Sequence, residues 1–76
     1  MITPQSGSAG YAELARQLRE DILGGRLQPG QRLPSEADLQ QRFGVARQTA
    51  RRAVAVLRSE GLAVMVPGHG TFVREN

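Results

Sequence analysis

The side chains best suited to a chemical task lie close together near the middle of the chain, at Arg47, Gln48, Arg51 and Arg52. A guanidinium group can bond guanine O6 and N7 together, and a glutamine amide can bond adenine N6 and N7 in the same way. Arg47 and Arg51 are four residues apart, so they share one face if this stretch is helical. The residues therefore predict a surface that contacts base edges. The simpler alternative is the solvated face of an Arg-rich helix.

The segment that positions these side chains has the features of two short helices joined by a turn. Ser35 is a natural N-cap for a helix over residues 36–43, and Gly44 permits the left-handed conformation that turns the chain. A second helix is predicted over residues 47–60, because its apolar residues recur at helical spacing. We therefore predict a helix-turn-helix over about residues 36–55, whose second helix enters the major groove.

Two further elements flank this segment. Apolar residues at helical spacing predict a first helix over residues 9–23. Two β-rich runs around a glycine-containing loop predict a hairpin over about residues 62–74. Residues 1–8 lack periodicity and are predicted to be a flexible N-terminal arm. The predicted fold is mainly α with a small β-hairpin: one winged helix-turn-helix domain over residues 9–74, in which the hairpin is the wing.

The loop of the predicted wing carries Gly68, His69 and Gly70. The two glycines permit positive φ and let the backbone come close to a sugar-phosphate chain. His69 between them would point outward, where it could reach the minor groove or a phosphate. The alternatives are a plain tight turn and an exposed histidine without a partner. Ser35 likewise either caps its helix only or also donates to a phosphate.

Composition narrows the class of protein. The chain has 76 residues and a net charge of +3, with a pI of about 11.1, and every basic residue is Arg. A pI above about 9 in a small domain fits a polyanionic partner. The net charge is modest, and the alternative reading of the all-Arg composition is codon bias. The sequence holds no Cys and a single His, so we expect no disulfide, no metal site and no cofactor. We also expect no membrane span and no signal peptide, because the sequence has no long apolar run. We expect no enzymatic activity, because no acid–base pair or nucleophile constellation is present.

A series of short motifs occurs along the chain in a fixed order: Ile22-Leu23-Gly24-Gly25-Arg26-Leu27, Pro29-Gly30, Leu33-Pro34-Ser35-Glu36, Phe43-Gly44-Val45, Gly61-Leu62 and Gly68-His69-Gly70-Thr71-Phe72-Val73. Through these motifs, about residues 10–74 resemble the DNA-binding domain of the GntR family of bacterial transcription regulators. The wing motif most resembles the HutC-like branch of that family.

The resemblance implies a regulator that binds double-stranded DNA at a palindromic operator as a dimer, usually as a repressor. With no membrane span or signal peptide expected, we predict a cytoplasmic, nucleoid-associated protein. Arg47 and Arg51 match the positions that contact guanine, and Gly68 matches the wing contact. Arg52 is expected to contact a phosphate or solvent, and Thr49 a phosphate or a thymine methyl. The full set of predicted DNA-contacting residues is Ser35, Glu36, Arg47, Gln48, Thr49, Arg51, Arg52, Gly68, His69, Gly70 and Thr71.

The chain departs from the family pattern in several places. Ala37 replaces a usual Arg that contacts DNA, Ala46 replaces a usual Ser or Thr helix cap, and Gln48 replaces a common Thr. Family members also carry a C-terminal domain that binds an effector and drives dimerisation, and this chain ends at Asn76. We therefore expect a monomer in isolation that pairs on DNA, with effector sensing outside these residues.

One alternative function remains open from the residues alone. A winged helix can also serve as a protein-interaction module without base-specific DNA binding. That use predicts apolar or acidic residues on the exposed face of the second helix of the motif, where this chain has arginines.

Overall fold

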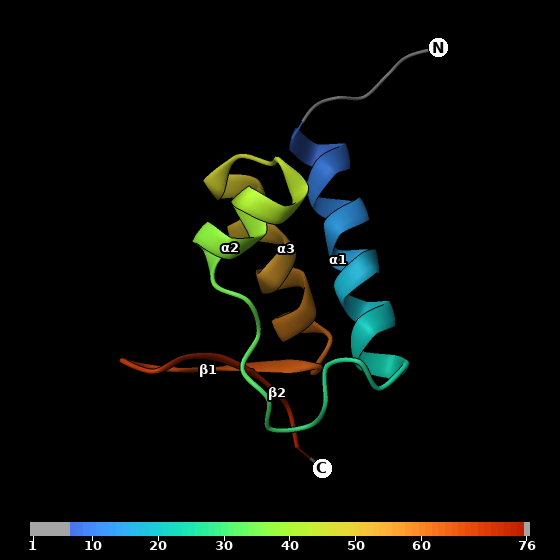
Figure 1. The fold of residues 1–76 in the computed structure, drawn as a ribbon, viewed down its shortest axis with the longest axis vertical. Coiled ribbons are helices and arrows are strands. Elements are labelled where there is room, and N and C mark those ends of the chain that lie inside the picture. The colour runs from blue at the N-terminus through green and yellow to red at the C-terminus, as the bar shows by residue number, and fades with distance from the viewer. Residues whose placement is uncertain (1–6, 76) are drawn as a thin grey trace.

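Three helices and a two-stranded hairpin make up residues 7–75, the part of the chain that the computed structural model describes. The helices are α1 (Gly7–Leu23), α2 (Glu36–Phe43) and α3 (Arg47–Ser59), and the strands are β1 (Ala63–Val66) and β2 (Gly70–Val73). In Figure 1, α1 and α3 lie side by side, α2 lies beside the upper part of α3, and the hairpin lies below α3 and projects away from α1. The order of elements and the hairpin confirm the predicted winged helix-turn-helix fold.

The boundaries differ from the prediction by one or two residues. Helix α1 begins at Gly7 rather than at residue 9, so Gly7 and Ser8 belong to the helix and not to the predicted arm. The rest of that predicted arm, residues 1–6, lies outside the described residues. Helix α3 ends at Ser59, one residue before the predicted end. None of the helices described is both long and apolar enough to cross a membrane.

The core forms where the three helices and the base of the hairpin meet. Leu18 of α1, Leu39 of α2 and Leu57 of α3 are the largest fully buried side chains. Ala50 and Ala53 of α3 are also fully buried, and their small side chains allow α1 to pack closely against this helix. Burial of such an apolar stripe, rather than intrinsic helix propensity, is what stabilises short helices in a domain of this size.

An extended segment over residues 30–33 ties the hairpin to α2. The segment follows a type II turn over residues 28–31. In this turn Gly30 has φ 83° and the Gln31 N–H donates to the Gln28 carbonyl at 2.9 Å. The segment then runs beside β2: the Leu33 N–H donates to the Thr71 carbonyl at 2.8 Å, and the Val73 N–H donates to the Gln31 carbonyl at 2.8 Å. The wing is therefore attached to the segment that leads directly into the helix-turn-helix.

Candidate nucleic-acid interface

The start of α2 is fixed by a reciprocal cap. Ser35 Oγ accepts a hydrogen bond from the Asp38 N–H at 3.1 Å, and Asp38 Oδ2 accepts one from the Ser35 N–H at 3.3 Å. This capping box satisfies backbone donors that the first turn of a helix leaves unpaired. It confirms the predicted N-cap at Ser35 and makes Glu36 the first residue of α2.

The turn between α2 and α3 depends on Gly44. This residue takes φ 67° and ψ 29°, the left-handed conformation that ends helices, and its N–H donates to the Gln40 carbonyl at 2.8 Å. The next helix starts three residues later at Arg47. Its N-cap, Ala46, has no side-chain acceptor, so the first N–H groups of α3 have no side-chain cap.

Arg47 and Arg51 of α3 are joined through one carboxylate of α2. Arg47 Nε lies 3.1 Å from Glu36 Oε1, and Arg51 Nε lies 3.3 Å from Glu36 Oε2. The arginine side chains stay 69% and 64% exposed, whereas the Glu36 side chain is 32% exposed. The carboxylate therefore lies between the two arginines at the base of a solvent-facing surface. We call these three residues the Arg–Glu–Arg cluster.

The two arginines also change the acidity of Glu36. The hydrogen bond from Arg47 lowers the pKa of the Glu36 carboxyl below its ordinary value, and the hydrogen bond and charge of Arg51 lower it further. Partial burial acts in the opposite direction and is outweighed. Glu36 is therefore ionised at neutral pH, and the cluster carries two positive charges and one negative charge.

Two other predicted contacts on α3 face away from this surface. The Thr49 side chain is only 7% exposed, and it lies beside Gly10 of α1, so the structure does not place it where a phosphate or a thymine methyl could reach it. The Arg52 guanidinium lies over the ring of Tyr11, 4.5 Å from its centre, in a cation–π contact with α1. Gln48, in contrast, is exposed in the first turn of α3 beside Arg47.

The tip of the wing is a tight turn. The His69 N–H donates to the Val66 carbonyl at 2.9 Å, and Gly68 has φ 80°, as the third position of a type II turn requires. The plain-turn interpretation therefore accounts for Gly68 on its own. His69 is exposed at the end of the turn, as the sequence predicts for a residue that reaches outward.

A small pocket of about 190 Å³ lies between the start of α2 and the wing. It brings together the predicted residues Ser35, Glu36, Gly70 and Thr71. Arg32 also lines it, and a Cβ atom at Gly70 would lie 2.9 Å from Arg32 Nε, so only glycine allows the guanidinium this close. Sequence reasoning missed Arg32. Its place before Leu33-Pro34 marks an extended residue but does not show that it packs beside the wing.

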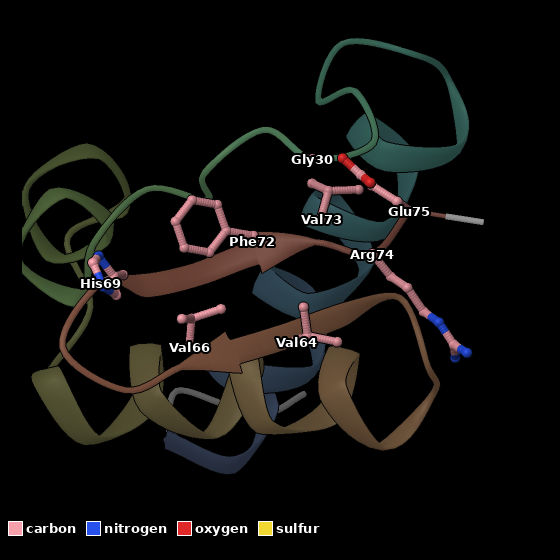
Figure 2. A pocket seen from close by; sticks show the side chains of 8 residues that line it. All are labelled: Gly30, Val64, Val66, His69, Phe72, Val73, Arg74 and Glu75. Carbon is pink, nitrogen blue, oxygen red and sulfur yellow. The ribbon is translucent and has the colours of Figure 1, made fainter.

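The opposite face of the hairpin has different chemistry. Figure 2 shows Val64, Val66 and Phe72 around an open pocket, with His69 at one end and Arg74 near the other. Val64 and Phe72 are cross-strand partners, so their side chains lie on the same face. An apolar surface does not suit a phosphate backbone, so the valines and Phe72 of this face are not part of the candidate interface.

No group of three potential metal ligands occurs within residues 7–75. The residues described above define the candidate interface. It consists of the Arg–Glu–Arg cluster, Gln48 and the uncapped start of α3, with the wing tip and Arg32 beside them.

The fold and the site together define a winged helix-turn-helix domain. Two of the three helices form the helix-turn-helix, whose second helix begins with exposed arginines, and the β-hairpin is the wing. Residues 10–73 match the family model described as bacterial regulatory proteins, gntR family. The chain belongs to this family. Its members are regulatory proteins rather than enzymes, which confirms that part of the prediction.

Curated relatives give the same assignment. The chain is 42% identical over 72 residues to the HTH-type transcriptional repressor NagR of Bacillus subtilis (strain 168). The matched region is 95% of this chain and 30% of the relative. It is 44% identical over 73 residues to the histidine utilization repressor of Klebsiella aerogenes, with 95% and 30% covered. The second match agrees with the predicted HutC-like branch. The chain thus spans about 30% of the length of these relatives.

Solved structures share the fold. The DNA-binding domain of AraR, determined in complex with operator ORR3, superimposes with a TM-score of 0.82 at 38% identity, over 96% of this chain and 82% of that chain. The same domain in complex with operator ORX1 gives a TM-score of 0.84 at 39% identity, over 96% and 90%.

Proposed function

We propose that this chain binds double-stranded DNA in a sequence-specific way and serves as the DNA-binding part of a transcriptional repressor. The observation that carries the proposal is the Arg–Glu–Arg cluster, which presents two exposed guanidinium groups on one face of α3, at the helix end that enters the major groove. The similarity to named repressors, and to a domain determined with operator DNA, supports the same function.

In this proposal α3 lies in the major groove. Arg47 and Arg51 contact guanine, and Gln48 contacts an adjacent base. The uncapped N–H groups at the start of α3 suit a phosphate. The wing tip, with Gly68 and His69, lies at the adjacent minor groove. Thr49 has no part in it, and Arg52 is held against Tyr11.

We further propose that the chain is monomeric alone and pairs on a palindromic operator, in the cytoplasm where bacterial DNA is found. Effector binding would belong to parts of the protein outside these residues, because the chain matches about 30% of the length of its relatives. Sedimentation of the free chain and of the chain with a two-site duplex tests the pairing.

Selection of bound sequences from a random duplex pool tests the main proposal. The expected result is a two-part consensus that contains guanine in each half, with affinity that falls steeply as salt rises. Failure to enrich any consensus, or affinity insensitive to salt, would favour a protein-interaction module. The exposed residues on α3 argue against that alternative, because they are basic and amide side chains rather than apolar or acidic ones.

A further inference from the structure

Glu36 is an acidic residue in the middle of a surface that is proposed to bind a polyanion. Its carboxylate neither caps its own helix, which Ser35 and Asp38 do, nor lies in the core. It forms two hydrogen bonds, both with arginines of the neighbouring helix. A carboxylate here repels phosphate and so lowers general affinity for DNA, which calls for a compensating role.

The atoms used in these bonds point to that role. Each arginine donates through Nε, so neither hydrogen bond with Glu36 uses the terminal nitrogens. The terminal nitrogens of a guanidinium can donate side by side to guanine O6 and N7. Glu36 therefore holds both guanidinium groups by their inner edge and leaves the outer edge of each for a base.

The charges point the same way. Two arginines and one glutamate leave the cluster with one formal positive charge instead of two. Contacts to phosphate depend on this charge and occur on any sequence, whereas contacts to guanine depend on the geometry of the fork. Glu36 neutralises one of the two positive charges and also fixes the geometry of the guanidinium groups. It therefore weakens contacts to phosphate and preserves contacts to guanine.

We infer that Glu36 determines specificity by acting through Arg47 and Arg51: it suppresses their binding to phosphate on arbitrary DNA and orients them for guanine. This inference rests on the proposed function, because it requires a preferred DNA sequence. Glu36 is thus a positioning residue whose removal strengthens binding to the wrong DNA.

The test compares Glu36→Gln with the unmodified 76-residue chain on two duplexes, one selected from a random pool and one of the same composition in scrambled order. Loss of the carboxylate should allow about one more phosphate contact, which corresponds to roughly fivefold tighter binding to the scrambled duplex near 0.15 M salt. The slope of log K against log salt should steepen by about 0.9. The ratio of affinities for the two duplexes should fall by at least that factor.

Two further variants serve as controls. Glu13→Gln removes the same charge from an exposed ion pair with Arg16 on α1, and it should leave the affinity ratio unchanged. Glu36→Asp keeps the charge on a shorter side chain, so binding to scrambled DNA should stay close to that of the unmodified chain. Because the capping box forms without Glu36, both variants at this position should fold, and circular dichroism checks this.

Several outcomes would overturn the inference. These are an unchanged ratio in Glu36→Gln, equal weakening on both duplexes, or an equal effect of Glu13→Gln. Loss of preference at one base pair with no gain on scrambled DNA would instead make Glu36 a direct contact to cytosine. If the unmodified chain itself prefers no sequence, the proposed function fails. A clear preference with an unchanged ratio in the variant would overturn only the role of Glu36.

Discussion

At the scale of single residues, shared ion pairs give the two sides of the molecule opposite local charge. Glu36, a single carboxylate on α2, is shared by two arginines of α3, whereas on α1 one arginine, Arg16, is shared by Glu13 and Glu20. The first arrangement leaves an excess positive charge and the second an excess negative charge. A DNA ligand should therefore meet the α3 side, and the exposed side of α1 should face away from it.

This difference predicts distinct effects of removing arginines. We expect Arg47→Ala and Arg51→Ala each to cost roughly 1–3 kcal/mol on the selected site and to relax the preference at one base pair. Removal of the α1 arginine in Arg16→Ala should change binding to selected and random duplexes equally. Titrations of fluorescent duplexes measure all three variants. Equal losses on selected and random DNA for Arg47→Ala would make Arg47 a phosphate contact and not a base contact.

At the scale of elements, the two helices of the motif begin in different ways. Helix α2 has a complete capping box, and α3 starts at Ala46 with no side-chain cap. The Ala46 backbone already has the extended conformation of an N-cap, with φ −70° and ψ 157°. A serine could therefore take its place without moving the chain.

We expect Ala46→Ser to stabilise the folded protein by about 0.5–2 kcal/mol, because its hydroxyl would accept from an N–H in the first turn of α3. Chemical denaturation of both proteins, fitted with a common slope, measures this difference. Ser35→Ala is the matched comparison, because it removes the cap of the neighbouring helix and should destabilise the protein by a similar amount. A destabilised Ala46→Ser variant would show that the first turn of α3 cannot accept the cap.

The elements that could be predicted from the sequence are those set by local chemistry. Ser35 and Gly44 act within a few residues of themselves, and the structure confirms both predictions. The Arg–Glu–Arg cluster was predicted only as separate contacts, because the distance between α2 and α3 is not a property of either helix. Arg32 was missed for the same reason, as it packs against a glycine far along the chain.

The burial of Thr49 is a feature of α3 that the sequence prediction missed. The prediction made it a contact to a phosphate or a thymine methyl, in the same helix turn as Arg47 and Gln48. It lies four residues before Ala53 and eight before Leu57, so the three form one stripe that α1 covers. That spacing was present in the sequence and could have identified Thr49 as buried. Periodicity does not show how wide a stripe the neighbouring helix covers.

At the scale of the whole molecule, ion pairs within and between the helices make stability depend on pH. Hydrogen bonds from arginines lower the pKa values of Glu13, Glu36 and Glu60, each from an ordinary value of 4.5. A lowered folded-state pKa means that the unfolded chain binds more protons in acid. The stabilisation is therefore complete above about pH 4.5 and is lost as the pH falls through the lowered values.

We predict that the urea midpoint is constant between pH 6 and 7 and falls as the pH drops below about 4.5. Glu60 contributes through Arg19, which links the end of α3 to α1 at 2.8 Å. Glu60→Gln should lower the midpoint at neutral pH and reduce the fall in acid, because it removes one of the groups that titrate. A midpoint that stays level down to pH 3 would show that these ion pairs do not persist in solution.

The hydrogen bonds of residues 30–33 with β2 have a consequence for how the molecule opens. The amides of Leu33 and Val73 lie on this ladder, which joins the wing to the residues just before α2. Neither amide can exchange with solvent unless the ladder separates, and its separation releases the wing and the start of α2 together. We therefore expect both amides to exchange in heavy water with the same opening free energy, as one cooperative unit. The His69 amide at the tip can open separately and should exchange faster. The wing and the start of α2, which are both proposed to lie at the DNA, would then unfold cooperatively. A mutation that destabilises the wing would therefore also destabilise the start of α2.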